Sequence, residues 1–417
     1  MTQQVQDTPK GWIRGRTTVV TDLAPMQKPF VLLGILAALA LFAVILYTTD
    51  IVQGVLFLIG IALGLTLLYA RFGFTSAFRR LMSVGNAQGI QAHMVMLAVA
   101  STLFAFILST GFSFTGTAPT GYVSPVGVSV LLGAFIFGIG MQLGSGCASG
   151  TLYSVGGGSS SMILTLLSFI AGSVLGAYHF NYWMEETWAA EPFSLAESTN
   201  LGFFGAWAVQ MALFAAIYFG LKFIATKKNS PAMKPLPTTT GFKKIFRGSW
   251  PLLAAAIILA LLNALTLAVR GTPWGITSAF ALWGSKFLEL FGVDVASWGY
   301  WQANAEQLQN PILADSTSVM NFGIILGAFI AASATGAFKP GKIKPGIAGA
   351  SIIGGLLMGY GARLAFGCNI GAYFGGIASF SLHGWVWAVM AMLGTGLALF
   401  IRPFFGLKNP KPKDSLC

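Results

Sequence analysis

Two eleven-residue stretches share one pattern: Gly140–Gly150 reads GMQLGSGCASG and Gly361–Gly371 reads GARLAFGCNIG. Both fit Gly-x-x-Leu-x-x-Gly-Cys-x-x-Gly, which puts Cys147 and Cys368 at equivalent positions 221 residues apart. The chain has only three cysteines, so two of them occupy corresponding points of a duplicated, glycine-rich motif. A second string, Gly-x-Thr-Ser-Ala-Phe, begins at Gly73 and again at Gly275. These recurrences predict a chain made of two related halves.

The composition is that of a membrane protein. Hydrophobic residues make up 55% of the chain and charged residues 9%, and the mean hydropathy is +0.74. Apolar runs of about 20 residues, the length that crosses a bilayer, recur along the chain, and no polar stretch is long enough for a separate soluble domain. The hydropathy predicts an all-α polytopic protein with ten transmembrane helices, at 30–48, 51–70, 90–112, 125–143, 161–180, 202–221, 250–269, 320–338, 346–364 and 382–402.

The charged residues indicate how these helices are oriented. With the N-terminus in the cytoplasm, all of the 24 Lys and Arg residues except Arg270, Lys286 and Arg363 fall in cytoplasmic segments or at their edges. Most of the 12 acidic residues fall outside. Cytoplasmic loops of membrane proteins are enriched in Lys and Arg, so we expect both termini in the cytoplasm. The net charge of +12 is explained by this topology, and nucleic acid is not an expected partner.

The two halves are expected to be inverted relative to each other. The spans 51–70, 90–112, 125–143 and 161–180 correspond in order to 250–269, 320–338, 346–364 and 382–402, and the chain crosses five times between equivalent spans. Because five is odd, the second half must run in the opposite sense, and inverted repeats place a shared site near the bilayer midplane. The expected division is a cytoplasmic tail (1–29), an extra transmembrane helix (30–48), the first repeat (49–182), an outer loop with a connecting helix and cytoplasmic linker (183–249), the second repeat (250–404) and a cytoplasmic tail (405–417).

Each half also contains two apolar segments too short or too broken to cross the bilayer. They follow Arg71 and Gly146 in the first half, and Pro273 and Gly367 in the second. Unwound backbone is tolerated at membrane depth only where it faces protein or a water-filled cavity. We therefore expect four re-entrant segments that meet at the waist of an hourglass. Glycines outside the breaks, such as those of the spans 125–143 and 346–364, are expected to serve helix packing.

The glycine–cysteine breaks are the candidate solute pathway. A half-helix that begins at a break directs its first N–H groups into the cavity and favours an anion there. Arg363 is a charged residue inside the predicted span 346–364. Its guanidinium either takes part in function or forms a structural hydrogen bond to a carbonyl group. Three interpretations of Cys147 and Cys368 stay open: apolar packing, a thiol–disulfide relay, and weak S–H donors that contact a sulfur-containing solute. The candidate pathway residues are Cys147, Cys368, Gly146, Gly367, Gly73, Gly275, Asn369 and Arg363.

Other chemistry is not favoured by the residues. The two thiols have no nearby His or Cys to complete a metal site, and the three histidines lie in separate segments, so we expect no metal and no cofactor. No Walker-type phosphate-binding loop is present, and no acidic residue lies in a predicted span. The aromatic residues near the predicted outer ends are expected to form an interfacial belt; they include Trp183, Trp188, Trp298, Tyr300 and Trp301.

At these motifs the chain resembles the YeeE/YedE family of bacterial inner-membrane proteins, a family of sulfur-transport proteins. The matching strings are RFGFTSAFRR, GMQLGSGCASG, WGITSAFALWG with LFGVDVASWGY, and GARLAFGCNIGAYFGGIASFSLHGW. The resemblance implies an hourglass of inverted repeats in which Cys147 and Cys368 pass thiosulfate at the constriction. Family members often carry a third cysteine in the first re-entrant segment, where this chain has Gly73. The hydroxyls of Thr75, Ser76, Thr277 and Ser278 are either replacement donors or helix caps.

The resulting prediction is a permease of the bacterial inner membrane and not an enzyme. It would take up thiosulfate or a related small sulfur or selenium species as an anion. A small cytoplasmic sulfur-carrier protein is a partner implied by the resemblance. The alternative is a membrane thiol oxidoreductase or sulfurtransferase in which a cysteine becomes a persulfide.

Overall fold

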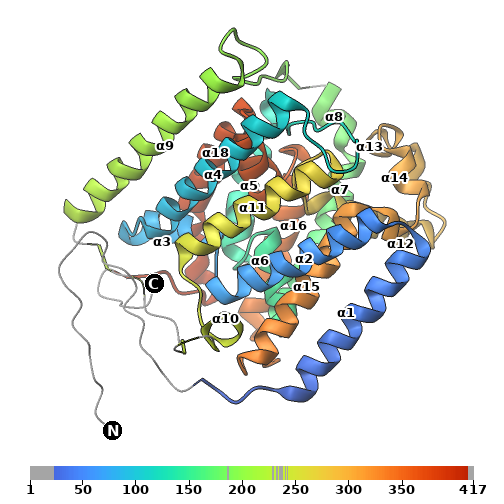
Figure 1. Cartoon of the computed structure of the whole chain (residues 1–417), viewed down its shortest axis with the longest axis vertical. Helices are drawn as coiled ribbons and strands as arrows, with labels where there is room; N and C mark the ends of the chain where they lie inside the picture. The colour runs from blue at the N-terminus through green and yellow to red at the C-terminus, as the bar shows by residue number, and fades with distance from the viewer. Residues whose placement is uncertain are drawn as a thin grey trace.

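The computed structural model describes residues 23–185, 187–227, 230–231, 233, 238–239, 241 and 243–411. Most of the predicted N-terminal tail, parts of the linker, Glu186 and Cys417 lie outside these residues. The described chain is almost entirely helical, and ten of its helices are long and apolar enough to cross a membrane. They are α1 (Lys28–Thr48), α2 (Ile51–Ala70), α4 (Gln88–Thr110), α5 (Val128–Leu143), α7 (Ser160–Tyr178), α9 (Gly202–Lys227), α11 (Leu252–Arg270), α15 (Ser316–Ala334), α16 (Pro345–Leu364) and α18 (Leu382–Ile401). The chain is therefore an all-α polytopic membrane protein (Figure 1).

The ten predicted spans coincide with these ten helices to within a few residues. Among the helix starts, the largest difference concerns the span predicted at 320–338, which begins four residues earlier, at Ser316. The carboxylate of Asp315 accepts hydrogen bonds from the backbone N–H and the hydroxyl of Ser318, at 2.8 and 2.6 Å. This side-chain cap satisfies first-turn donors and fixes the helix start upstream of the apolar run.

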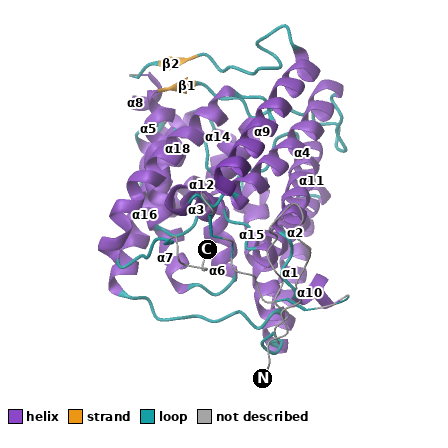
Figure 2. Ribbon diagram, turned by 90° about the vertical axis from the view of Figure 1, so that its left-hand side faces the viewer, coloured by secondary structure: helices purple, strands orange, loops and turns teal. Residues whose placement is uncertain are grey.

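Four short helices lie at the predicted breaks. They are α3 (Phe74–Val84), α6 (Ala148–Gly156), α12 (Thr277–Glu289) and the π-helix η3 (Asn369–Gly375), which continues into α17 (Gly376–Ala378). Figure 2 shows α3 and α12 in the middle of the bundle, among the long helices. The remaining elements connect the helices at their ends: α8 (Phe180–Glu185), α10 (Lys243–Arg247), η1 (Val295–Ser297), α13 (Gly299–Gln302), α14 (Ala305–Gln309), η2 (Ile312–Ala314), η4 (Arg402–Phe405) and the strand pair β1 (Val126–Gly127) and β2 (Ala189–Ala190).

Helix packing repeats between the two halves. α2 packs along α15, and their equivalents α11 and α4 pack in the same way; α7 packs along α16, as α18 packs along α5. The helices α5 and α16, which end at the two glycine–cysteine breaks, pack against each other. The two helices outside the sequence repeat follow the same rule, because α1 packs on α15 and α9 packs on α4. Figure 1 shows α1 and α9 on opposite flanks of the bundle.

Glycines allow the close approach of these helices. A Cβ on Gly354 of α16 would collide with the backbone of Gly140 and Gly144 at the end of α5. A Cβ on Gly138 would collide with the carbonyl of Ala391, and one on Gly359 with that of Phe169. The prediction that these glycines serve helix packing is confirmed, and their small size brings the two break-bearing helices together at the centre.

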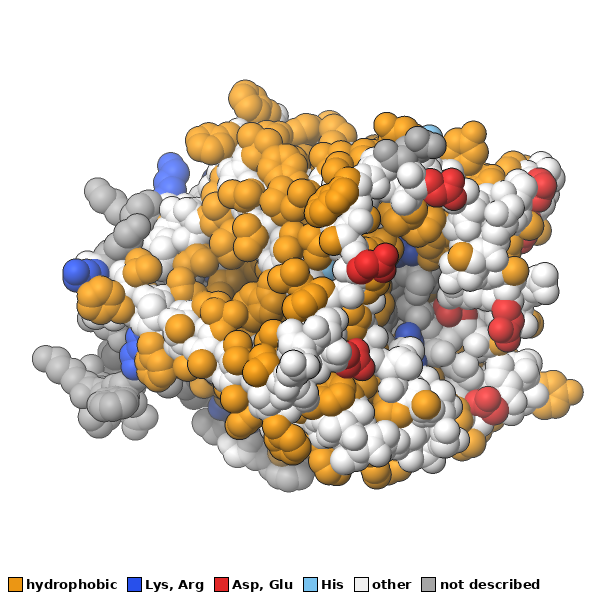
Figure 3. Space-filling model, turned by 90° about the horizontal axis from the view of Figure 1, so that it is seen from above, with side chains coloured by type: hydrophobic (Ala, Val, Ile, Leu, Met, Phe, Trp, Pro, Cys, Tyr) orange, Lys and Arg blue, Asp and Glu red, His pale blue; other side chains and the backbone are white. Residues whose placement is uncertain are grey.

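Charge is segregated along the bundle. Figure 3 shows acidic side chains gathered at one end, a broad apolar belt, and Lys and Arg side chains at the opposite end. We call the first the acidic end, which carries Asp50 and Asp315 at the start of α2 and α15, and the second the basic end. The basic end includes the start of α1 and the end of α15, which are joined by the hydrogen bond from the backbone N–H of Gln27 to the carbonyl of Ser333 at 3.0 Å.

Candidate functional site

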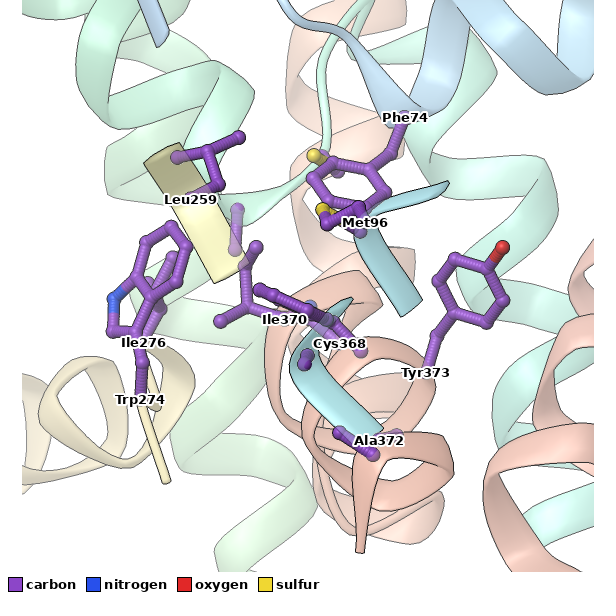
Figure 4. Packing of buried hydrophobic residues seen from close by; sticks show 14 of the residues in the cluster. Phe74, Met96, Leu259, Trp274, Ile276, Cys368, Ile370, Ala372 and Tyr373 are labelled. Carbon is purple, nitrogen blue, oxygen red and sulfur yellow. The ribbon is translucent and has the colours of Figure 1, made fainter. Parts of the chain in front are cut away.

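All four short helices begin in one large buried cluster in the core. Each N-cap, or the residue beside it, is a buried member of the same cluster: Phe74 for α3, Cys147 for α6, Ile276 for α12 and Cys368 for η3. Figure 4 shows Phe74, Ile276 and Cys368 arranged around Ile370. Because the N-terminus of a helix carries partial positive charge, four of them directed at one region create a positive potential without a formal charge.

Cys147 lies between α5 and α6 and is 2% exposed. Its sulfur is 3.4 Å from the hydroxyl oxygen of Ser149, within the first turn of α6. The hydroxyl of Thr75, on α3, also lies beside this sulfur and makes no hydrogen bond with any other described residue. The thiol therefore has hydroxyl groups from two helices beside it.

Cys368 occupies the corresponding place between α16 and η3 and is 1% exposed. Its sulfur accepts a hydrogen bond from the backbone N–H of Ile370 at 3.4 Å, so it caps the helix that it begins. The side chain of Asn369 is fully buried, and neither its Oδ1 nor its Nδ2 has a partner among the described residues. Buried amide groups are normally hydrogen-bonded, so an unpaired amide next to a thiol points to a ligand that would complete it.

Both breaks have the same irregular backbone. Ser145 and Phe366, each two residues before the cysteine, have φ values of 63° and 51°. Such left-handed conformations cost a non-glycine residue about 1–2 kcal/mol. Gly367 follows with φ 141°, a value open to glycine, whereas Gly146 has an ordinary φ. Equivalent strain at equivalent positions shows that the two breaks are one structure used twice.

Large apolar side chains flank the glycines that precede α3 and α12. Phe72 and Phe74 flank Gly73, and Trp274 and Ile276 flank Gly275 at the equivalent place in the other half. All four are at most 1% exposed and lie in the same cluster as the cysteines. In this conformation both thiols are buried as well.

In each half a polar contact links the long helix that ends at the break to a short helix. In the first half, Gln142 at the end of α5 donates to the carbonyl of Thr75 on α3 at 3.1 Å and accepts from Arg79 at 3.2 Å. In the second half, Arg363 occupies the place equivalent to Gln142 and donates to the hydroxyl of Thr277 on α12 at 2.7 Å. Each contact holds the start of one re-entrant helix against the break that carries the cysteine.

Arg363 also donates to the phenol of Tyr300 at 2.6 Å, and its Nε has no partner among the described residues. Tyr300 and Trp301 are buried in a second apolar cluster, where Trp301 donates to Ser285. The prediction that these two aromatics belong to an interfacial belt is therefore wrong, because their sequence position near a helix end does not reveal the fold of the connecting segment over them. Trp188, by contrast, is 65% exposed.

The three basic residues at the acidic end surround α12. Arg270 donates to the hydroxyls of Thr272 and Thr317, and Lys286 on α12 donates to a backbone carbonyl. Together with Arg363 they donate these hydrogen bonds to neutral groups, although the carboxylate of Asp315 lies within electrostatic range of Arg270. Figure 3 shows a recess at this end with basic side chains inside it. The recess is thus electropositive behind an acidic rim.

Of the cavities toward the basic end, two are lined by Arg71. The larger, about 440 Å³, is lined by residues that include Tyr69, Arg71, Ser154 and Arg247. The smaller, about 10 Å³, runs from Arg71 to Gly73 at the start of α3. They bring the surface of the basic end close to the re-entrant helices.

Comparison with known proteins agrees with this architecture. A family model described as "Sulphur transport" matches residues 69–397, which span both breaks. The chain belongs to this sulphur-transport family. The match includes all four short helices and both cysteines that begin them.

Relatives in the family are named as transporters. The chain is 27% identical over 358 residues to the thiosulfate transporter TsuA of Escherichia coli (strain K12), covering 82% of this chain and 94% of that protein. It is 29% identical over 360 residues to the thiosulfate transporter TsuA of Spirochaeta thermophila, covering 81% and 95%. It is 35% identical to the probable transporter YedE of E. coli, but over only 169 residues, 40% of this chain and 42% of that protein.

The structure brings together most of the sequence-predicted pathway residues. Cys147, Cys368 and Asn369 lie at the centre with the glycines that precede the short helices, whereas Arg363 is a tie between α16 and α12. Gln142 was missed, although its alignment with Arg363 in the repeat could have identified it. The hydroxyl of Thr75 does not cap its helix, because the structure shows no side-chain cap there. No group of three metal-ligating side chains occurs in the part of the chain that the structure describes.

Proposed function

We propose that the protein carries thiosulfate, or a related small sulfur or selenium oxyanion, inward across the bacterial inner membrane. The solute would pass Cys368 and then Cys147 at the centre of the bundle. The basic end would face the cytoplasm, with both termini there, and a small cytoplasmic sulfur-carrier protein would receive the solute. The relatives named thiosulfate transporters support the choice of solute.

The observation that carries the proposal is the pair of thiols at two converging helix N-termini. Each thiol has beside it a polar group without another hydrogen-bond partner among the described residues, the hydroxyl of Thr75 or the amide of Asn369. Helix N-termini and neutral donors suit a small anion, and polarizable sulfur suits a solute that exposes sulfur. At its narrowest point such a pathway binds the anion with neutral donors and without a fixed positive charge. Binding is therefore weak enough for the anion to leave.

Electrostatics support entry from the acidic end. Arg270, Lys286 and Arg363 surround the re-entrant helix α12 at that end, although most other basic residues lie at the opposite end. Basic residues on the side that ordinarily lacks them are not explained by membrane topology. Held by neutral groups, they attract an anion into the recess and raise its local concentration near Cys368.

Growth on a single sulfur source tests this function. A host that lacks thiosulfate uptake would receive the wild type, Cys147→Ala, Cys368→Ala or the control Cys417→Ala, which removes the third cysteine of the sequence. We expect rescue on thiosulfate by the wild type and by the control, and little or none by either pathway variant. Equal rescue by all four proteins would contradict a thiol-lined pathway.

Intact mass separates transport from sulfur-transfer chemistry. Purified wild-type protein would be incubated with thiosulfate and then trapped in acid. If the thiols only make hydrogen bonds, the mass stays unchanged during uptake. A reproducible adduct of one sulfur atom on Cys147 or Cys368 would instead identify a persulfide intermediate and overturn the non-enzymatic proposal.

A further inference from the structure

Two corresponding helix ends differ in the residue that caps them. α2 ends at Arg71, with φ 45° and ψ 46°, and α11 ends at Gly271, with φ 79°. Both are left-handed C-caps immediately before a re-entrant segment. Glycine adopts this conformation freely, whereas a side chain there is strained. The helix end at the basic side therefore keeps an arginine at a position where the fold favours glycine.

The guanidinium of Arg71 is not used to stabilise the fold. The side chain is exposed and makes no hydrogen bond or ion pair with any residue in the described ranges. It lines two of the cavities at the basic end, and Phe72 and Gly73 also line the smaller one. Arg71 thus stands at the junction between the surface cavity and the re-entrant helix α3.

The helix α6 extends from the Cys147 thiol to the larger of these cavities. Cys147 begins this helix, and Ser154 near its end lines the larger cavity. Tyr153 lies within electrostatic range of both Cys147 and Arg71. Arg247 adds a second positive charge to the cavity, although its guanidinium donates to the carbonyls of Ala24 and Ala334.

We propose that Arg71 forms an oxyanion-binding station at the cytoplasmic end of the pathway, where the anion pauses after it leaves Cys147. The proposal rests on the proposed function for its direction and solute. The planar guanidinium presents paired N–H donors that match two oxygens of a small divalent oxyanion, and serine hydroxyls complete the lining. A solute released from neutral donors at the waist thereby meets a full positive charge before it reaches water.

Sulfate is the probe for this station, because it has the oxyanion oxygens but no exposed sulfur for the thiols. Equilibrium binding of radiolabelled sulfate would be measured on the purified full-length protein at fixed ionic strength. The proteins compared are the wild type, Arg71→Gly, Arg71→Lys and the double variant Cys147→Ala/Cys368→Ala. Arg71→Gly copies the other half of the molecule and relieves the strained φ, so its melting temperature should equal or exceed that of the wild type.

We expect saturable sulfate binding by the wild type and by the thiol-free variant. Arg71→Gly should bind at least about tenfold more weakly, as expected for the loss of charge-assisted hydrogen bonds, and Arg71→Lys should lie between the two. Unchanged affinity in Arg71→Gly, or no saturable binding by the wild type, would overturn the station. Failure of thiosulfate uptake would leave this binding result standing, so the two proposals fail separately.

Discussion

The two halves of the molecule share a backbone and differ in charge. Both breaks have a strained residue followed by glycine and a cysteine that begins a short helix. The residue five positions before the cysteine is Gln142 in one half and Arg363 in the other. Both side chains tie a re-entrant helix to its break, but only Arg363 brings a buried charge.

The difference shows which features duplication must preserve. Glycines, strained turns and helix starts are fixed by backbone geometry, so they recur in both halves. Charges depend on the side from which the solute comes, and they diverge. Uneven charge cannot by itself drive accumulation, because a pathway without an energy source only equilibrates the solute. The uneven charge instead sets how strongly each side of the pathway binds the anion. Variants at equivalent positions of the two halves can therefore be compared.

The hydrogen bonds between the break and the re-entrant helix are expected to give the largest difference in stability between the two halves. Arg363→Ala leaves the buried hydroxyls of Thr277 and Tyr300 without their donor, and we expect a loss of about 3 kcal/mol in the free energy of unfolding. Gln142→Ala should cost about 1–2 kcal/mol, because it removes neutral hydrogen bonds to the carbonyl of Thr75 and the hydroxyl of Thr395, while its third partner, Arg79, is only partly buried. Denaturant unfolding in detergent measures both. A larger loss for Gln142→Ala would show that the charged tie is not the stronger one.

The glycine before each cysteine gives a second comparison. Gly367 has φ 141°, and an added Cβ would lie 2.9 Å from the backbone nitrogen of Ala372, so Gly367→Ala should destabilise by about 1–3 kcal/mol. Gly146 has an ordinary φ and its nearest atom would be 3.3 Å away, so Gly146→Ala should cost less than about 1 kcal/mol. Thermal unfolding of the two variants side by side checks this order, and equal losses would contradict it.

A third thiol introduced at position 73 is expected to have the smallest effect of these changes, and the effect is on thiosulfate uptake. Gly73 has an ordinary extended backbone, and a side chain there meets only the hydroxyl of Ser76, which can rotate. We expect Gly73→Cys to fold normally and to raise thiosulfate uptake about two- to fivefold, the value of one weak S–H donor. Gly275→Cys has open space and is the matched control in the other half. Lower uptake with either cysteine would indicate that the pathway depends on the space that the absence of a side chain at Gly73 or Gly275 leaves.

The sequence allowed the ten spans and four breaks to be predicted because both depend on local features. Apolar run length identifies a crossing helix, and a duplicated glycine–cysteine string identifies a break. The contacts of Arg363 could not be predicted, since they join residues far apart in the chain and depend on how the segment with Tyr300 folds over the bundle. The strained φ of Arg71 was also invisible, because nothing in the residue type indicates a left-handed helix end.

The initial rate of radiolabelled thiosulfate uptake into proteoliposomes tests the central claim most directly. The wild type would be compared with Cys147→Ala, Cys368→Ala and the double variant at equal protein incorporation. Because the two thiols act in series on one pathway, each single variant should lose at least about tenfold in rate, and the double variant should lose less than the product of the two. A double variant that takes up thiosulfate at the wild-type rate would contradict the account.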